Sequence, residues 1–298
     1  MSKKTDPYII PASELPINAD GTIYHLNIRP DQIADTILTV GDPGRVKEVS
    51  KHFDSIEHKA SKREFHTHTG RIGKKRITVV STGIGPDNID IVLNEMDALA
   101  NINFKSRTIK KRHKQLTFIR LGTSGTPHAD IPVDSLVISE HGLGFDNVMA
   151  FYDHKMDRKT GYLLKKIHQH ITDQKANLPL PYLTVAHPEL VAAFESLGFK
   201  GITATCPGFY GPQGRRLRLK PNAIIPDVLE SFQYKKHRIT NFEMETSAIF
   251  GLSALMGHRA LAINTILANR ATGEFTKRYK ASVKDMVIAA LERLETLS

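Results

Sequence analysis

The chain has 298 residues, of which 40% are apolar and 24% are charged, the balance of an ordinary globular protein. It contains no apolar run of the roughly 20 residues that a membrane-spanning helix needs, and no secretory apolar segment follows its basic start. The single cysteine, Cys206, excludes an internal disulfide and a zinc site built from several thiolates, so we expect a cytoplasmic protein.

The first 36 residues are rich in Pro, Asp and Asn and predict an N-terminal arm, residues 1–21, followed by a short element. Beyond them, β-branched and apolar runs predict strands at 37–40, 76–82, 117–121, 135–138, 202–205, 239–242 and 260–268. Apolar residues at helical spacing predict helices at 45–53, 87–100, 161–171, 188–199, 244–256 and 279–297. No linker divides the chain, so we expect one α/β domain over 1–298, with a central mixed β-sheet flanked by helices.

The net charge of +10 would suit a protein that binds nucleic acid, or one that captures a small anionic substrate. Much of the excess comes from Lys105–Lys114, sequence KSRTIKKRHK, a pattern typical of a solvated basic loop. No zinc-finger, RRM or basic-zipper signature accompanies this stretch. We therefore expect neither a nucleic-acid partner nor a membrane partner.

Three glycine-rich stretches are expected where strands end: VGDPGR at 40–45, STGIGP at 81–86 and RLGTSG at 120–125. Glycine lets the backbone approach a ligand closely, and free N–H groups in such turns bind anions. Arg45 and Arg120 add guanidinium groups, whose paired donors suit phosphate. Together the three stretches favour an oxyanion pocket over three ordinary turns. None of them matches the P-loop pattern, so hydrolysis of nucleoside triphosphates is not expected.

Two further segments carry groups that suit a nucleoside. Asn241–Glu245, sequence NFEME, is expected where a strand meets a helix at the carboxyl edge of the sheet, the usual ligand site in α/β folds. Its acids could accept hydrogen bonds from the vicinal hydroxyls of ribose, or they could simply be acids favoured by a helix N-terminus. Gly208–Arg216 holds Gln213, Arg215 and two aromatic rings that could stack on a base, although it could also be a surface turn.

The motifs GDPGR, REF, STGIG, IRLGTSG, FYGPQGR and NFEMETSA occur in this order and resemble the nucleoside phosphorylase-I family, most closely its uridine phosphorylases. The resemblance covers roughly residues 22–298, and the motifs agree in order and in spacing. It implies the α/β fold of that family. It also implies the phosphorolysis of uridine, or of a related pyrimidine nucleoside, to the base and ribose 1-phosphate by a pentosyltransferase of nucleoside salvage.

The resemblance implies a phosphate site made of Gly41, Arg45, Arg120 and Thr123. Arg63 is similar to the phosphate arginine that this family donates from a neighbouring subunit. Phosphate is then a co-substrate, and no metal or organic cofactor is implied. Some relatives hold a monovalent cation at a subunit interface, near the position of Glu64.

The resemblance also implies a nucleoside site made of His25, Phe209, Tyr210, Gln213, Arg215, Glu243, Met244 and Glu245. Glu245 would hold the ribose 2′- and 3′-hydroxyls, Gln213 and Arg215 would read the uracil edge, and these three with Arg120 would be the catalytic residues. His25 is similar to the histidine that a neighbouring subunit donates to the 5′-hydroxyl. The implied partners are a nucleoside, phosphate and further copies of the chain, in a dimer or in a hexamer built from dimers, with shared active sites.

Purine-specific relatives carry an aspartate after the strand that here ends Leu267–Arg270, sequence LANR, so this ending favours a pyrimidine. The second glycine turn reads GIGPDN where the family often has GIGGPS. Three alternatives stay open. They are a purine or broad-specificity nucleoside phosphorylase, a hydrolytic nucleosidase of the same fold, and a nucleic-acid-binding or regulatory protein built on that fold. The arginine set speaks against the hydrolase, and only the basic stretch supports the third.

Overall fold

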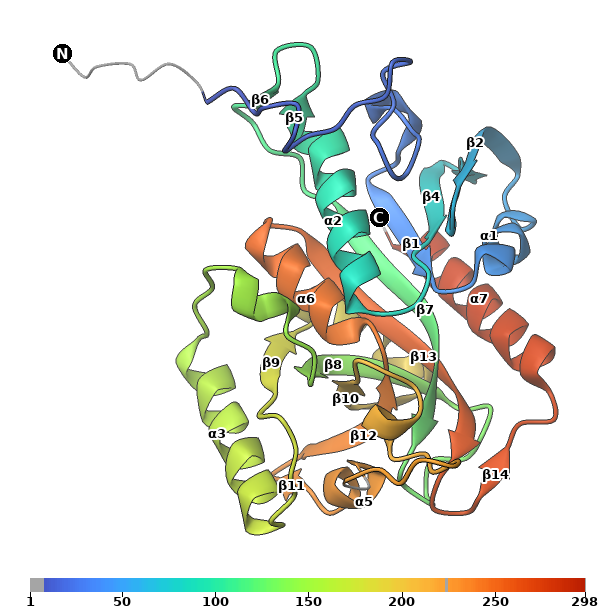
Figure 1. Ribbon diagram of the computed structural model, residues 1–298. Coiled ribbons are helices and arrows are strands. Elements are labelled where there is room, and N and C mark those ends of the chain that lie inside the picture. Colours follow the sequence, from blue (N-terminus) through green and yellow to red (C-terminus); the bar gives the residue numbers. More distant parts are fainter. Residues whose placement is uncertain (1–7, 223–224, 298) are drawn as a thin grey trace.

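The structure, a computed structural model, describes residues 8–222 and 225–297. Within these ranges the main sheet has twelve strands, which run through the middle of the molecule (Figure 1). They are β1 (Thr36–Val40), β2 (Ser55–Lys62), β3 (Phe65–Ile72), β4 (Lys75–Ser81), β7 (Thr117–Thr126), β8 (Leu136–Gly144), β9 (Tyr182–Val185), β10 (Phe199–Thr205), β11 (Gln233–Tyr234), β12 (His237–Glu243), β13 (Arg259–Asn269) and β14 (Glu274–Phe275). A separate short hairpin is made of β5 (Ile102–Asn103) and β6 (Thr108–Ile109).

The helices that surround the sheet differ in length from two turns to five. The α-helices are α1 (Pro43–Ser50), α2 (Pro86–Asn101), α3 (Arg158–Asp173), α4 (Pro188–Phe194), α5 (Ile225–Glu230), α6 (Thr246–Leu255) and α7 (Tyr279–Thr296). The short 3-10 turns are η1 (Pro30–Gln32), η2 (Val148–Phe151), η3 (Glu195–Leu197) and η4 (Gly211–Gln213). No helix of the described residues is both long enough and apolar enough to cross a membrane.

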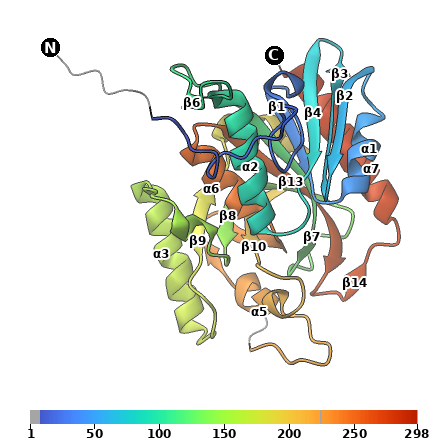
Figure 2. The ribbon, with the colours of Figure 1, turned by 45° about the horizontal axis from the view of Figure 1, so that its top comes forward.

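The sheet is mixed, as predicted. Its order is β11-β12-β10-β8-β13-β7-β1-β4-β3-β2, with β9 beside β8 and β14 beside β13. Parallel pairs join β12, β10 and β8, and also β13, β7, β1 and β4, whereas β2, β3 and β4 form antiparallel hairpins (Figure 2). A further pairing of Phe242 with Gly125 joins β12 to β7. The strands β12, β10, β8, β13 and β7 therefore form a closed ring. Glycine is needed there because a Cβ would lie 2.8 Å from the Phe242 ring.

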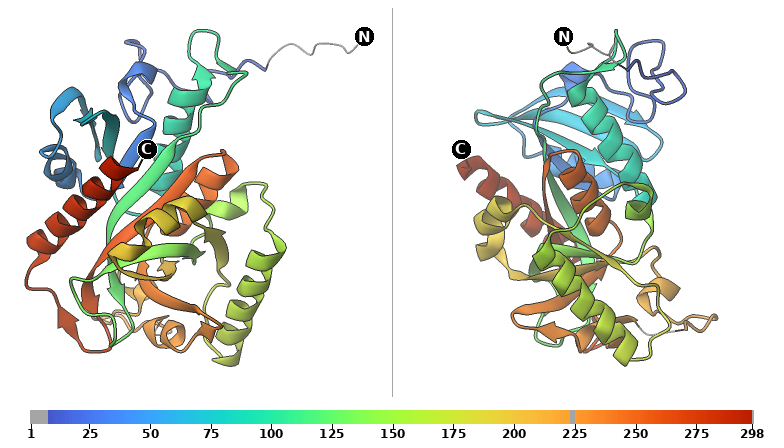
Figure 3. Two further views of the ribbon diagram at one scale, coloured as in Figure 1. Left: turned by 180° about the vertical axis from the view of Figure 1, so that it is seen from behind. Right: turned by 90° about the vertical axis from the view of Figure 1, so that its left-hand side faces the viewer.

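Helices cover both faces of the sheet. Helices α2 and α6 lie on one face, and α4 and α7 lie on the other, where Figure 3 shows α7 in red crossing the sheet from behind. Apolar residues at helical spacing on α2, among them Ile89, Val92, Leu93 and Met96, are buried against this core. Helix α6 is buried on all sides near its start because α2 covers the side that faces away from the sheet.

Most predicted elements are present, with ends that differ by a few residues. The prediction that RLGTSG at 120–125 is a turn closing a strand is wrong. Strand β7 continues to Thr126 because Gly122–Gly125 still pairs with β13. The hairpin of β2 and β3 was not predicted, since β2 is mostly polar and exposed on most of its length.

The N-terminal arm lies partly outside the described residues, because residues 1–7 are not among them. From Tyr8 onward the arm contacts the β5–β6 hairpin, which contains part of the basic stretch Lys105–Lys114. The guanidinium of Arg107 donates to the carbonyl oxygens of Ile10 and Pro11, at 2.7 and 2.9 Å. Arg107 of the basic stretch therefore has a structural role, because it holds the arm against the hairpin.

Candidate active site

A cavity of about 750 Å³ opens where β1, β4, β10 and β12 end beside the middle of β7. Strand register explains why distant motifs meet there. Thr39 of β1 pairs with Arg120 of β7, and Val40 pairs with Ser81 of β4. The glycines that follow β1 and β4, Gly41 and Gly83, therefore reach the wall of the cavity close to Arg120.

Ten of the predicted site residues line this cavity: Gly41, Arg45, Arg120, Thr123, Phe209, Gln213, Arg215, Glu243, Met244 and Glu245. Three others do not line it. Tyr210 lines a neighbouring cavity of about 740 Å³, which shares Arg215 with the first. His25 and Arg63 lie outside the cavity of their own chain.

Arg120 is buried and holds the two acids of the NFEME motif. Its Nε donates to Glu243 at 2.9 Å, and its Nη2 donates to Glu245. Burial lowers the pKa of this guanidinium, but the two carboxylates raise it by more, so Arg120 is charged. Among the described residues Nη1 makes no hydrogen bond, and it lies against Gly122, where a Cβ would come within 2.7 Å. Glycine at this position leaves room for the guanidinium at the cavity wall.

The two acids of the motif have different surroundings. Glu243 accepts hydrogen bonds from the backbone N–H groups of Glu245 and Thr246, so the alternative that it serves the start of helix α6 is correct for this residue. Glu245 accepts from the N–H of Gly85 at 2.8 Å, which ties the second glycine turn to the start of α6. Its other oxygen accepts from Arg120. Burial raises the pKa of Glu245, and Arg120 opposes this effect.

The first glycine turn starts helix α1 and places Arg45 in the cavity. Asp42 caps the helix by accepting from the N–H of Gly44 at 2.8 Å. Arg45 donates to the carbonyl oxygen of Leu121 and to the hydroxyl of Tyr279, both at 3.2 Å. Sequence reasoning missed Tyr279, the first residue of α7, because no local motif marks it.

Gln213 and Arg215 form a pair at the cavity wall. Nη1 of Arg215 donates to the amide oxygen of Gln213 and to the carbonyl oxygen of Phe209. The guanidinium carbon lies 3.7 Å from the centre of the Phe209 ring, within the range of a cation–π contact. Burial, together with the nearby charge of Arg270, lowers the pKa of Arg215 to about 10, so the group stays charged at neutral pH.

Arg270 is a further residue that sequence reasoning did not place in the site. Its guanidinium donates to the carbonyl oxygens of Gln213 and Gly214, at 3.2 and 3.3 Å, and thereby fixes the loop that carries the pair. Its neighbour Asn269 is buried and turned away from the cavity. The Asn269 amide donates to two backbone carbonyl oxygens and accepts from two backbone N–H groups.

The two residues expected to act across an interface lie apart from this cavity. Arg63 is exposed at the two-residue turn between β2 and β3, with a φ of 54°. That conformation costs a non-glycine residue about 1–2 kcal/mol. His25 is half-buried, and its Nδ1 lies 2.6 Å from the Glu95 carboxylate, which also accepts from the backbone of His25 and Leu26.

Glu64 lines the cavity beside Gly83, at the place where the resemblance suggested a monovalent cation. It belongs to no cluster of acidic, histidine or cysteine side chains close enough to share a metal ion. In the part of the chain that the structure describes, the one such cluster is Glu140, His141 and His237, which lies outside this cavity.

Comparisons with known proteins agree with this geometry. The family model described as the Phosphorylase superfamily matches residues 35–297. The chain is 29% identical to a uridine phosphorylase of Thermococcus kodakarensis over 292 residues, which cover 96% of this chain and 91% of the relative. It is 25% identical over 272 residues to a DeoD-type purine nucleoside phosphorylase of Listeria welshimeri, with 90% of this chain and 97% of the relative covered.

A solved structure shows the same arrangement of the chain. The nucleoside phosphorylase of Trypanosoma brucei, described as showing uridine phosphorylase activity, superposes with a TM-score of 0.85 at 30% identity. The alignment covers 95% of this chain and all of that one. The match of residues 35–297 includes every strand and helix that lines the cavity, and the chain belongs to the phosphorylase superfamily.

Proposed function

We propose that this protein is a nucleoside phosphorylase that cleaves uridine with inorganic phosphate to uracil and ribose 1-phosphate. One observation carries the proposal. A single cavity brings together two arginines, Arg45 after a glycine turn and Arg120 on β7, with a carboxylate able to hold a diol and an amide–guanidinium pair. The same chemical groups are what a ribonucleoside and a phosphate require, and the relatives named as uridine phosphorylases support the choice of substrate.

The reaction needs charge stabilisation at both ends of the sugar. A phosphate oxygen bonds to C1′ while the C1′–N1 bond breaks, and the electron pair leaves with uracil. We place phosphate beside Arg45, Thr123 and the free Nη1 of Arg120, where its negative charge stabilises the cationic carbon. Glu245 accepts hydrogen bonds from the ribose hydroxyls and so holds C1′ in line between the attacking phosphate and the departing base.

The base would lie against Gln213, Arg215 and Phe209. Gln213 can donate to one uracil oxygen and accept from N3–H, while Arg215 donates to O4, where negative charge collects as the base leaves. Cytosine carries an amino donor instead of O4, and this donor would face the guanidinium with no acceptor between them. A buried polar group left unpaired in this way costs about 1–3 kcal/mol.

We therefore expect uridine cleavage that requires phosphate, with uridine preferred over cytidine and inosine. The measurement is product analysis by chromatography on a panel of nucleosides, each with and without phosphate. Cleavage of uridine at an unchanged rate without phosphate would favour a hydrolase. Cleavage of inosine as fast as uridine would favour a purine or broad-specificity phosphorylase, an activity for which the Listeria relative is named.

We also propose that the working form is a homo-oligomer in which Arg63 and His25 reach the cavity of a neighbouring copy. Both lie outside their own cavity, and Arg63 keeps a costly backbone conformation at the tip of a hairpin. A second copy would bring Arg63 to the phosphate and His25 to the 5′-hydroxyl.

Mixing two inactive variants should test this sharing of sites. Arg63→Ala would remove the donated cation, and Arg215→Ala would remove the base contact within the chain. Each homo-oligomer should lose activity, whereas subunit exchange should create some sites with both residues intact. Activity should therefore return to about a quarter of wild type in an equal mixture of dimers, since half of the dimers are then mixed and one site in each is complete. No recovery, despite mixed oligomers proven by mass spectrometry, would mean that each chain builds its own site.

A further inference from the structure

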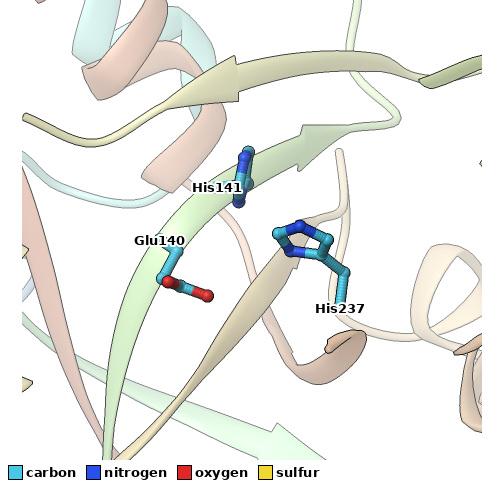
Figure 4. A group of neighbouring side chains, drawn as sticks. All are labelled: Glu140, His141 and His237. Atoms are coloured by element: carbon cyan, nitrogen blue, oxygen red, sulfur yellow. The ribbon is translucent and has the colours of Figure 1, made fainter. Parts of the chain in front are cut away.

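Three side chains outside the candidate active site converge on one point of the sheet. Glu140 and His141 belong to β8, and His237 is the first residue of β12 (Figure 4). One potential ligand atom from each lies within 4.8 Å of the others. The two histidines line a separate cavity of about 660 Å³, which shares no residue with the cavity that holds Arg120.

An irregularity in the sheet explains how neighbouring residues on one strand can serve one site. Consecutive side chains of a regular strand point to opposite faces. Here Gly201 of β10 pairs with Ser139, but the next residue, Ile202, pairs with His141, so Glu140 is an extra residue in β8. Such a bulge changes the direction of the side chains around it, and bulges are frequent at functional sites.

The two imidazole rings lack the partners that buried polar groups normally have. Nδ1 of His141 and Nδ1 of His237 are buried without a hydrogen-bond partner in the described chain. The ring centres lie 5.3 Å apart at 89°, so the edge of one ring meets the face of the other. A group that accepts the nitrogen lone pairs would remove the cost of leaving these atoms unpaired.

Charged side chains from several segments surround the two rings. Lys159, Lys236 and Asp157 lie near His141, and Lys159, Lys235, Lys236 and Glu140 lie near His237. Nζ of Lys200 lies 3.6 Å from the Glu140 carboxylate.

We propose that Glu140, His141 and His237 bind one divalent transition-metal ion, with Zn²⁺ as the preferred ion. Two imidazoles and a carboxylate suit zinc, whereas calcium and magnesium prefer oxygen ligands only. Zinc–nitrogen bonds of about 2.0–2.1 Å require ligand atoms about 3.3 Å apart, so the side chains close around the ion by rotation. Because the nearby lysines repel a dication, we expect micromolar rather than nanomolar affinity.

The ion would connect two strands that are not neighbours in the sheet. Strand β10 separates β8 from β12, and β12 continues from His237 to Glu243 at the candidate active site. The metal would therefore stabilise the half of the sheet that carries the ribose-binding acids. The metal ion takes no part in the proposed reaction, and its binding does not depend on which nucleoside is the substrate.

The test is calorimetric titration of the full-length, untagged protein with Zn²⁺ alone in phosphate-free buffer. We expect one saturable site per chain and a rise in Tm on saturation, because a ligand that binds the folded state stabilises it. His141→Gln and His237→Gln should each weaken the affinity by about 100-fold or more, and Glu140→Gln by about tenfold. Buried Cys206 is the only cysteine of the chain, so thiolates should not obscure the result.

Two controls make the result specific. His154→Gln removes an exposed histidine from the same region of the chain and should bind zinc as the wild type does. Arg215→Ala, altered in the candidate active site, should also bind zinc normally, which separates this proposal from the proposed function. Co²⁺ should give the visible absorption of a tetrahedral site in the wild type and not in His237→Gln. No saturable site in the wild type, or equal affinity in both histidine variants, would overturn the proposal.

Discussion

The Arg120→Met protein should cleave uridine with a kcat/KM lower than that of the wild type by on the order of 10²–10³, the usual loss for one preorganised donor. It should also be less stable. Arg120 is buried with Glu243 and Glu245, and removing one partner of such a group leaves charge uncompensated, at a cost of about 3–5 kcal/mol. Steady-state kinetics and denaturant unfolding measure the two effects separately.

Two companion variants separate catalysis from folding. Arg120→Lys keeps the charge but loses the two-pronged contact, so its stability should recover more than its activity. Arg120→Met combined with Glu245→Gln removes the excess negative charge and should regain stability while activity stays low. Wild-type kcat/KM in either Arg120→Met protein would show that this residue does not act on phosphate.

The Arg215→Ala protein should lose uridine cleavage by a similar factor, on the order of 10²–10³ in kcat/KM, while its Kd for phosphate changes little. Arg215 contacts Gln213 and Phe209 rather than the phosphate residues. Its loss removes the cation that stabilises negative charge on the departing base. Kinetics with uridine and phosphate titration by calorimetry provide the two readouts.

Arg216 offers a matched control for this prediction. It is the next residue of the same loop, carries the same charge and is exposed, and it does not line the cavity. Arg216→Ala should therefore keep near-wild-type kinetics. An equal loss in both variants would indicate that overall positive charge, rather than a contact with the base, supports the reaction.

The fold and much of the site could be predicted from local patterns. Strands such as β1 and β13 are mainly apolar, and α2 and α7 carry apolar residues at helical spacing, so their types could be predicted from these patterns. In this chain, many of the residues that line the cavity follow strand ends or lie beside glycine. The motifs that mark such positions therefore marked the site as well.

Other features depend on contacts between distant parts of the chain. Arg120 and Glu245 are 125 residues apart, and nothing local shows that they form an ion pair. Strand β7 passes through a glycine-rich stretch because β13 pairs beside it, which overrides the turn preference of that sequence. The Glu140, His141 and His237 cluster was missed because it depends on a shift of register between β8 and β10.

Residues of the continuous strand β7 and residues of the loop that Arg270 holds differ in how freely they can be substituted. This difference suggests how the base specificity of relatives could diverge. Arg120 and Thr123 sit on a strand flanked on both sides, so almost any change there disturbs the sheet. Gln213 and Arg215 sit on a segment fastened by two bonds to its backbone carbonyls, which place few demands on its side chains. Substitutions within this one loop can therefore change which base is accepted, while the phosphate-binding residues on β7 stay the same.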